Sequence, residues 1–350
     1  MEKNNLSIKR KDGSFLARIF SVQEAGILVP LILLIVIFSC LNSGFYSLPN
    51  IFSVLKTLAF YGIVAVGMTL LIIGGDIDIS VGSTAGFAAV FSTFIMMQFN
   101  CFGMLDTPNE WIGVFICMII TLGICSLVGI LNAFLIVDFK LPAFIATIAT
   151  LYVVRGAIMV VTNGNPIYPL PKFFMDDIGR FQIPITKVGE ELIGISLPII
   201  VFIVLVIVFE IVLRRTKFGR NVYATGSNIE VAKLAGINTR RVRYINFIIT
   251  AMLAALSGML VAAFTRQGYP PIGQGWEMQI IAAAAVGGIA MTGGSGSMIG
   301  TLLGVLIMNI VNNGLVMMNI DTFVQQAVQG VIILVAVYVD IVRRNRKVHV

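Results

Sequence analysis

Long apolar stretches, separated by short polar segments, dominate this chain. There are ten such stretches. Each is compared with a transmembrane helix, which needs about 20 apolar residues to cross the ~30 Å hydrocarbon core of a bilayer. Of the 350 residues, 58% are hydrophobic and only 12% are charged, which excludes a disordered chain and an ordinary soluble enzyme. We therefore expect an all-α polytopic membrane protein with about ten transmembrane helices. The stretches are 26–41, 51–73, 80–99, 111–137, 142–162, 194–213, 244–264, 276–291, 297–317 and 322–341.

The positive charges predict the orientation of these helices. With the N-terminus inside, the inner segments hold 18 of the 24 Lys and Arg residues and the outer segments hold four, a strong positive-inside bias. Both termini are then cytoplasmic, as tails 1–25 and 342–350 around one transmembrane domain, 26–341. This topology explains the net charge of +7, so no nucleic-acid partner is expected. The longest loops, 163–193 outside and 214–243 inside, are too short to bury a core of their own.

The residues that enzymes and metal sites need are scarce. Cys40, Cys101, Cys117 and Cys125 are scattered, and the only histidine, His349, lies near the end of the chain. No Gly-Lys pair occurs, so the chain lacks the phosphate-binding loop of the G-x-x-x-x-G-K-[ST] type. We expect no catalytic site, no metal and no cofactor. If transport uses ATP, the ATPase is another chain.

Two carboxylates and three glycines interrupt the apolar sequence at 74–83. One interpretation is a broken helix beside a translocation pathway or gate, because carboxylates at membrane depth usually line a wet path or pair with a cation. The other is a cytoplasmic turn in which Asp78 or Ser80 caps the next helix. Spacing alone gives the two equal weight, and Asp76, Asp78 and Ser80 are the candidates in either case.

Arg155 is a fixed cation well inside an apolar stretch. A central arginine costs a few kcal/mol even on the mildest insertion scale, so a partner is expected. It either contacts substrate or an aspartate in a polar cavity, or bonds to backbone carbonyls as a structural cation. The second interpretation is slightly favoured.

A short capped helix is predicted within the inside loop 214–243. Asn228 is a good N-cap for a helix at 229–235, Gly236 is a good C-cap, and Glu230 and Lys233 complement the helix dipole. Such a helix is suited to docking a cytoplasmic partner. The alternative is an amphipathic loop that only anchors to anionic lipid head groups, and charge alone favours this alternative.

Glycines mark two further features. A tight group at 293–296 predicts a break or turn that matters to gating, while glycines spaced by four residues predict close backbone contacts. The gating candidates are Gly293, Gly294 and Gly296, and the packing candidates are Gly82, Gly86, Gly300 and Gly304.

In their order and spacing, these motifs resemble those of the membrane-spanning permease subunit of bacterial ABC importers of the ribose, xylose, arabinose and galactose type, a family that also includes autoinducer-2 permeases. The resemblance covers about residues 50 to 340. In the family pattern Gly-Gly-Ile-Asp-Leu-Ser there is one aspartate, whereas Asp76 adds a second beside Asp78, which leaves the electrostatics of this segment open. The matching stretches are 65–69, 77–83, 129–132, 155–156, 162–166 (with Asn163, a further pathway candidate), 226–237, 257–258, 287–288, 293–296, 300–304 and 312–314.

The resemblance implies a mechanism and partners. Two permease subunits, identical or homologous, would form the pathway in the bacterial cytoplasmic (inner) membrane. ABC ATPase subunits would bind from the cytoplasm, and an extracytoplasmic solute-binding protein would deliver a monosaccharide and supply most of the specificity. Alternating access would then be a population shift driven by ATP binding. The segment that couples the ATPase to the pathway would be 226–237, with Gly226, Asn228, Glu230, Ala232, Lys233 and Gly236.

Other functions stay open. Permeases for autoinducer-2, nucleosides or branched-chain amino acids share this general plan. A secondary transporter would couple to an ion through Asp76 and Asp78, but it would leave the predicted coupling segment without a role. An intramembrane enzyme is disfavoured because no plausible catalytic set is present.

Overall fold

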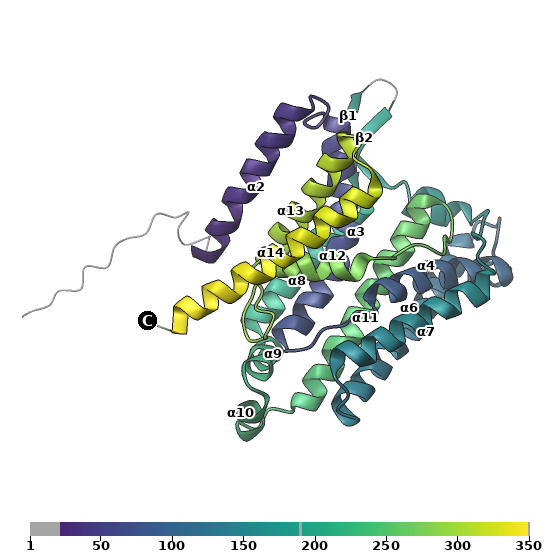
Figure 1. The fold of residues 1–350 in the computed structure, drawn as a ribbon. Helices are drawn as coiled ribbons and strands as arrows, with labels where there is room; N and C mark the ends of the chain where they lie inside the picture. Colours follow the sequence, from purple (N-terminus) through teal and green to yellow (C-terminus); the bar gives the residue numbers. More distant parts are fainter. Residues whose placement is uncertain (1–21, 189–190, 349–350) are drawn as a thin grey trace, which may run out of the picture.

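Each of the ten apolar stretches contains a helix. The structure is a computed structural model, which describes residues 22–188 and 191–348. The long helices pack side by side in a bundle, with α2 at one edge and α7 at the other (Figure 1). They are α2 (Val22–Leu41), α3 (Leu48–Ile73), α4 (Val81–Gln98), α6 (Glu110–Ala133), α7 (Ala143–Thr162), α8 (Leu197–Arg215), α11 (Thr239–Thr265), α12 (Trp276–Val286), α13 (Met298–Met317) and α14 (Thr322–Val348).

Within the described residues, seven helical segments are long and apolar enough to cross a membrane, rather than ten. The protein is therefore all-α and polytopic, with fewer full-length spans than expected. The apolar part of α2 and the whole of α12 are shorter than a span. With 11 residues, α12 extends about 16 Å, roughly half the hydrocarbon thickness. The seven segments are Leu48–Ile73, Val81–Gln98, Glu110–Asp138, Ala143–Thr162, Leu197–Arg215, Thr239–Thr265 and Met298–Met317.

Three helices form the interior of the bundle. In their most apolar windows, 83% of α3 and 72% of both α4 and α11 are buried, against 28% of α7 and α8. Helix α11 packs against α3, α4 and α6, and small residues allow close approach, since a Cβ on Gly258 would collide with the backbone of Ala85 in α4. The outer helices show apolar side chains outward, such as Val160 at 78% exposure. Such surfaces suit contact with lipid.

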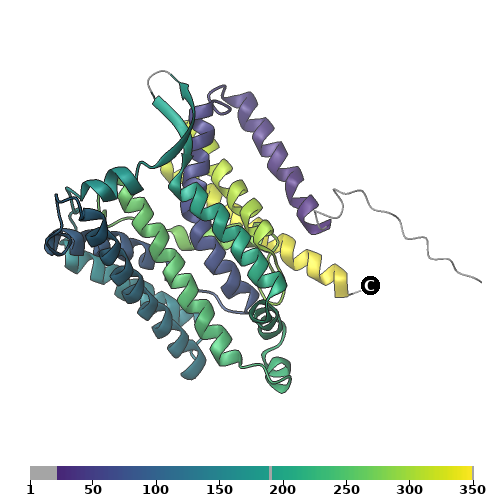
Figure 2. The ribbon, with the colours of Figure 1, turned by 180° about the vertical axis from the view of Figure 1, so that it is seen from behind.

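The two ends of the bundle carry different short elements (Figures 1 and 2). One end bears an antiparallel hairpin of β1 (Gln182–Val188) and β2 (Glu191–Ser196). The other end bears α9 (Lys217–Ser227) and α10 (Ile229–Leu234). Because α9 and α10 lie in the Lys- and Arg-rich segment 214–243, their end is the predicted cytoplasmic face. The remaining elements are α5 (Asn100–Gly103) and the π-helical turns η1 (Phe134–Asp138) and η2 (Phe173–Ile178).

Candidate functional site: a glycine junction beneath a short capped helix

Local hydrogen bonds define the short helix α10. The Asn228 side chain accepts from the backbone N–H groups of Glu230 at 3.0 Å and Val231 at 3.1 Å, which makes it the N-cap. Gly236 has a φ of +77°, the left-handed conformation that favours glycine just after a helix. The side chains of Glu230 and Lys233 form an exposed 2.9 Å ion pair. The helix occupies Ile229–Leu234, close to the predicted 229–235.

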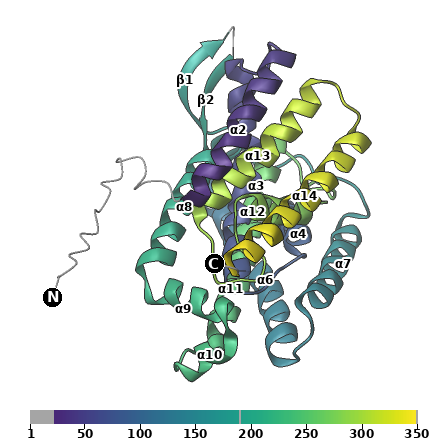
Figure 3. The ribbon, with the colours of Figure 1, turned by 60° about the vertical axis from the view of Figure 1, so that its left-hand side comes forward.

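One face of α10 is anchored and the other is free. Ala232 is buried at 3% exposure, whereas Val231 and Leu234 are exposed at 60% and 89%. Figure 3 shows α9 and α10 standing out from the end of the bundle. Two exposed apolar side chains at the tip of a capped helix, outside the membrane-spanning segments, form a surface suited to a protein partner.

Helix α9, which the sequence did not predict, attaches this tip to the bundle. Its N-cap Thr216 accepts from the Gly219 N–H at 3.1 Å. Near its other end, the Tyr223 hydroxyl donates to the Gly296 carbonyl at 2.8 Å. Helix α9 therefore lies directly on the 293–296 segment.

Four glycines make the closest contact, which we call the glycine junction: Gly75, Gly226, Gly293 and Gly294. The Gly294 N–H donates to the Ile73 carbonyl at 2.8 Å, joining the end of α3 to the segment before α13. A Cβ on Gly226 would collide with that same Ile73 carbonyl and with the Gly294 nitrogen. A Cβ on Gly293 would lie 2.7 Å from the Gly226 carbonyl oxygen. Three segments that are far apart in sequence thus meet backbone to backbone.

Asp76 lies beside this junction and is paired. Its two carboxylate oxygens accept from Arg243 Nε at 2.7 Å and Nη2 at 2.6 Å. Only 3% of the Asp76 side chain and 17% of the Arg243 side chain are exposed. A bidentate pair of this kind is strong and fixes geometry. It ties the segment after α3 to the second turn of α11, the next helix after α10 in the chain.

Asp78 stabilises the start of α4. Its side chain accepts from the Ser80 N–H at 2.7 Å, from the Ser80 hydroxyl at 2.6 Å and from Asn132 Nδ2 at 3.2 Å. Ser80 flanks the first residue of α4 without making a side-chain cap bond. The structure thus places Asp78 and Ser80 in a buried turn rather than a solvated one, with Asp78 bonded within the chain.

Arg155 lies elsewhere, against the segment between α11 and α12. Its Nη1 donates to the carbonyls of Pro270 at 3.1 Å and Ile272 at 3.0 Å. Arg155 is thus bonded to backbone carbonyls, as expected if it is a structural cation. A Cβ on Gly86 would collide with the Ile272 carbonyl, and one on Gly82 with the Gly273 carbonyl. The close contact of these two glycines is therefore with the segment before α12.

The remaining candidates do not join the junction. Gly300 and Gly304 bring α13 against α12, because a Cβ on either would collide with carbonyls of Gly287 or Ala283. Asn163 ends α7 with a φ of +50° and is exposed.

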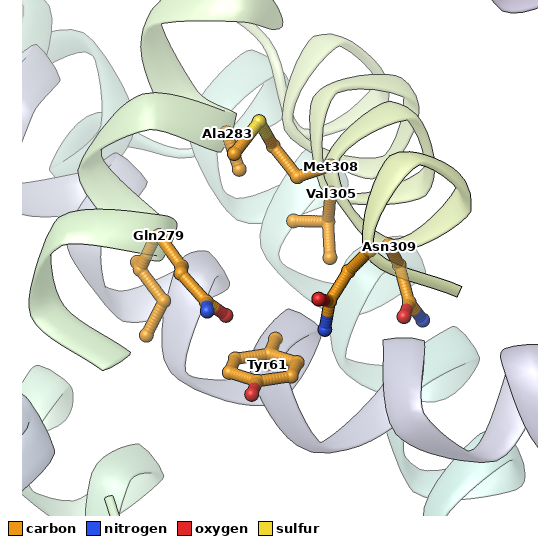
Figure 4. A pocket seen from close by; sticks show the side chains of 8 residues that line it. Tyr61, Gln279, Ala283, Val305, Met308 and Asn309 are labelled. Atoms are coloured by element: carbon orange, nitrogen blue, oxygen red, sulfur yellow. The ribbon is translucent and has the colours of Figure 1, made fainter. Parts of the chain in front are cut away.

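A small pocket between α3, α12 and α13, with three carboxamides among its lining residues, was missed by the sequence interpretation. Its free space is about 10 Å³, close to the volume that one water needs. Figure 4 shows Gln279 and Asn309 directed towards the space beside the Tyr61 ring. The available signal was the presence of carboxamides within apolar stretches. The lining residues are Tyr61, Gln279, Ile280, Ala283, Val305, Met308, Asn309 and Asn312.

The bundle, its lipid-facing helices and the capped helix on one face define a polytopic integral membrane protein of the permease class. The chain belongs to the family described as branched-chain amino acid transport system / permease component, which matches residues 50–337. Two of the relatives reported next are named as permeases of ABC transporters.

Three relatives are similar to the chain along nearly its whole length. A probable ABC transporter permease protein of Escherichia coli is 38% identical, covering 93% of this chain and 91% of the relative. The ribose import permease protein of Bacillus subtilis is 34% identical, covering 91% and 93%. The L-arabinose ABC transporter permease protein of Azospirillum brasilense is 31% identical, covering 93% and 90%. No solved structure matches the chain.

Proposed function

We propose that this chain is the membrane-spanning permease of an ATP-driven importer in the bacterial cytoplasmic (inner) membrane. Its substrate is a monosaccharide, a ribose-like pentose or a hexose. The names of the ribose and arabinose relatives support this substrate class. The observation that carries the proposal is the capped helix α10, held on the glycine junction with Val231 and Leu234 exposed.

The ATPase is a partner chain that binds α10 from the cytoplasm. A displacement of α10 reaches the bundle by two routes. Through α9 and Gly226 it reaches the end of α3 and the segment before α13; through the Asp76–Arg243 pair it reaches the start of α4. Both routes are short and made of backbone contacts or a bidentate ion pair, so they transmit movement with little slack. Binding of ATP to the partner then shifts the population between two arrangements of the bundle, giving alternating access.

Two further partners complete the importer. An extracytoplasmic solute-binding protein delivers the sugar at the face that bears β1 and β2. A second permease subunit, a copy of this chain or a homologue, forms the other half of the pathway.

An ion-coupled secondary transporter is the main competing function. Such a protein needs carboxylates that are able to bind the coupling ion near broken helices. Here Asp76 is occupied by a bidentate arginine and Asp78 by Ser80 and Asn132. These bonds favour the ATP-driven mechanism.

The test is uptake by proteoliposomes that contain the permease with its co-purified ATPase. Sugar-loaded binding protein is supplied outside and ATP inside, with D-ribose, D-xylose, L-arabinose and D-galactose as radiolabelled probes. We expect uptake that requires both ATP and the binding protein. Uptake driven by a proton or sodium gradient without ATP contradicts the proposal.

A further inference from the structure

We infer that residues of α3, α12, α13 and α14 form this chain's side of a binding site on the transport pathway for a neutral, polyhydroxylated solute. This inference rests on the proposed function and adds the residues that contact the sugar inside the membrane. The site is the pocket of Figure 4, extended by Gln329 of α14 and Trp276 of α12.

Carboxamides form a connected series across three helices. Gln279 Nε2 donates to Gln329 Oε1 at 3.1 Å, and Gln329 Nε2 donates to Asn312 Oδ1 at 3.4 Å. Asn309, at 5% exposure, donates to the Val54 carbonyl at 2.7 Å. Each of these amides has a hydrogen-bond partner within the chain, which offsets the cost of placing it in an apolar bundle. Gathered at one place they suit a polar ligand, because each amide offers both donors and an acceptor to a hydroxyl group.

Aromatic rings supply the complementary apolar surface. The Tyr61 ring lies 4.8 Å from the Trp276 ring, centroid to centroid. A monosaccharide presents C–H groups on a ring face and hydroxyls around its edge, so it needs aromatic surface and amides together. The residues that line the pocket include no charged side chain. A phosphorylated sugar or an amino acid would lack a counter-charge there.

The position of the pocket within the membrane fits a pathway. Tyr61 lies midway along α3, which spans Leu48–Ile73. Helix α12 begins at Trp276, beside Tyr61, and is followed by the 293–296 segment, which contacts α9. Because Tyr61 is midway along α3, the first turn of α12 lies inside the membrane. The non-helical segment before α12 is tolerated at this depth only next to protein or water. Asn50 and Asn313 exchange hydrogen bonds of 3.0 and 2.9 Å nearer the outer end, which extends the amide series towards the solvent.

The present conformation is closed. About 10 Å³ is free in the pocket, whereas pockets that hold small molecules measure roughly 300–1,000 Å³. Helices α12 and α13 are held together by backbone contacts at Gly300 and Gly304. Helix α14 joins the series through the Gln329 side chain, which is hydrogen-bonded to Gln279 and Asn312. When the site opens, hydroxyl groups of the sugar replace these two hydrogen bonds.

The experiment combines variants with deoxy-sugars in the reconstituted importer. Gln279→Met and Asn312→Leu remove amides while keeping similar volume, and Gln279→Asn retains a shorter amide. Asn42→Leu is the control, because Asn42 bonds to the Met317 carbonyl outside the pocket. Each preparation is first matched for folded protein. Uptake of the transported sugar and of its monodeoxy analogues is then measured with saturating binding protein.

We expect Gln279→Met and Asn312→Leu to lower maximal uptake about three- to tenfold, the range for one lost hydrogen bond, with ATP hydrolysis retained. For one deoxy analogue, the variant and wild type should transport equally, because the hydroxyl that the amide contacts is already missing. Gln279→Asn should recover part of the loss. If the loss is the same for every analogue, or matches that of Asn42→Leu, the site is wrong while the proposed function stands. If wild type transports none of the sugars, both fail.

Discussion

At the scale of single residues, the glycine junction depends on Gly226, which has no side chain, and on the buried ion pair beside it. Gly226 leaves room for the Ile73 carbonyl and the Gly294 N–H to bond at 2.8 Å. Asp76 and Arg243 neutralise each other where neither charge would be stable alone. The sequence marked Gly226, Gly294 and Asp76 but not which residues they contact, since residues 73, 226, 243 and 294 are brought together only by folding.

Gly226→Ala should destabilise the protein by about 1–3 kcal/mol, because the new methyl group collides with backbone that cannot rotate away. The measurement is thermal unfolding in mild detergent. Gly123→Ala is the matched control, since a Cβ at Gly123 meets nothing within 4 Å. Equal melting temperatures for the two variants would show that the junction is not tightly packed.

Arg243→Met should destabilise the protein by about 3–5 kcal/mol, because it leaves the Asp76 carboxylate buried and unpaired. The double variant Asp76→Asn/Arg243→Met should recover part of this loss, since no charge then remains. Lys233→Met, which breaks an exposed pair, should cost at most about 1 kcal/mol. A double variant that is no more stable than Arg243→Met would contradict the account of this pair.

At the scale of elements, the sequence predicted those features that are determined by residues close together in the chain. Helix α10 was predicted with its caps because Asn228 and Gly236 act within a few residues. Helix α9 was missed, since it lies in a polar loop without an apolar stretch. The hairpin of β1 and β2 was missed for the same reason. The pocket was missed because its carboxamides gather only when α12, α13 and α14 pack together.

Glu230→Arg should uncouple transport while the protein still inserts. It places a cation at the N-terminal end of α10 and next to Lys233, which opposes the helix dipole and breaks the ion pair. The measurement is substrate-stimulated ATPase activity with the partner chains, where we expect a loss of at least about tenfold. Glu230→Gln, which removes charge without reversing it, should keep most of the activity. Full stimulation in Glu230→Arg would refute the coupling role of α10.

Arg155→Leu should lower the amount of folded protein, because the carbonyls of Pro270 and Ile272 lose their donor. Yield by fluorescence-detected size exclusion and uptake per folded molecule are both measured. We expect the yield to fall severalfold and the uptake per molecule to stay within about twofold of wild type. Normal yield with abolished uptake would instead assign Arg155 to the pathway.

At the scale of the whole molecule, hydropathy and charge predicted the all-α membrane class, and the family match confirmed the resemblance. Within the described residues, seven segments rather than ten are long and apolar enough to span, and apolar blocks do not reveal, for example, that α12 ends after 11 residues. The central claim is that this bundle works as part of an ATP-driven assembly. In that assembly, α10 receives the ATPase at one face and sugar enters from the other.

The most direct test is tagged purification from the native host in mild detergent, followed by mass spectrometry of the chains that stay bound. We expect an ABC ATPase at a ratio near one to one with the permease, and its loss from Glu230→Arg preparations. A permease that purifies alone, and that in vesicles moves solute down an ion gradient without ATP, would contradict the account.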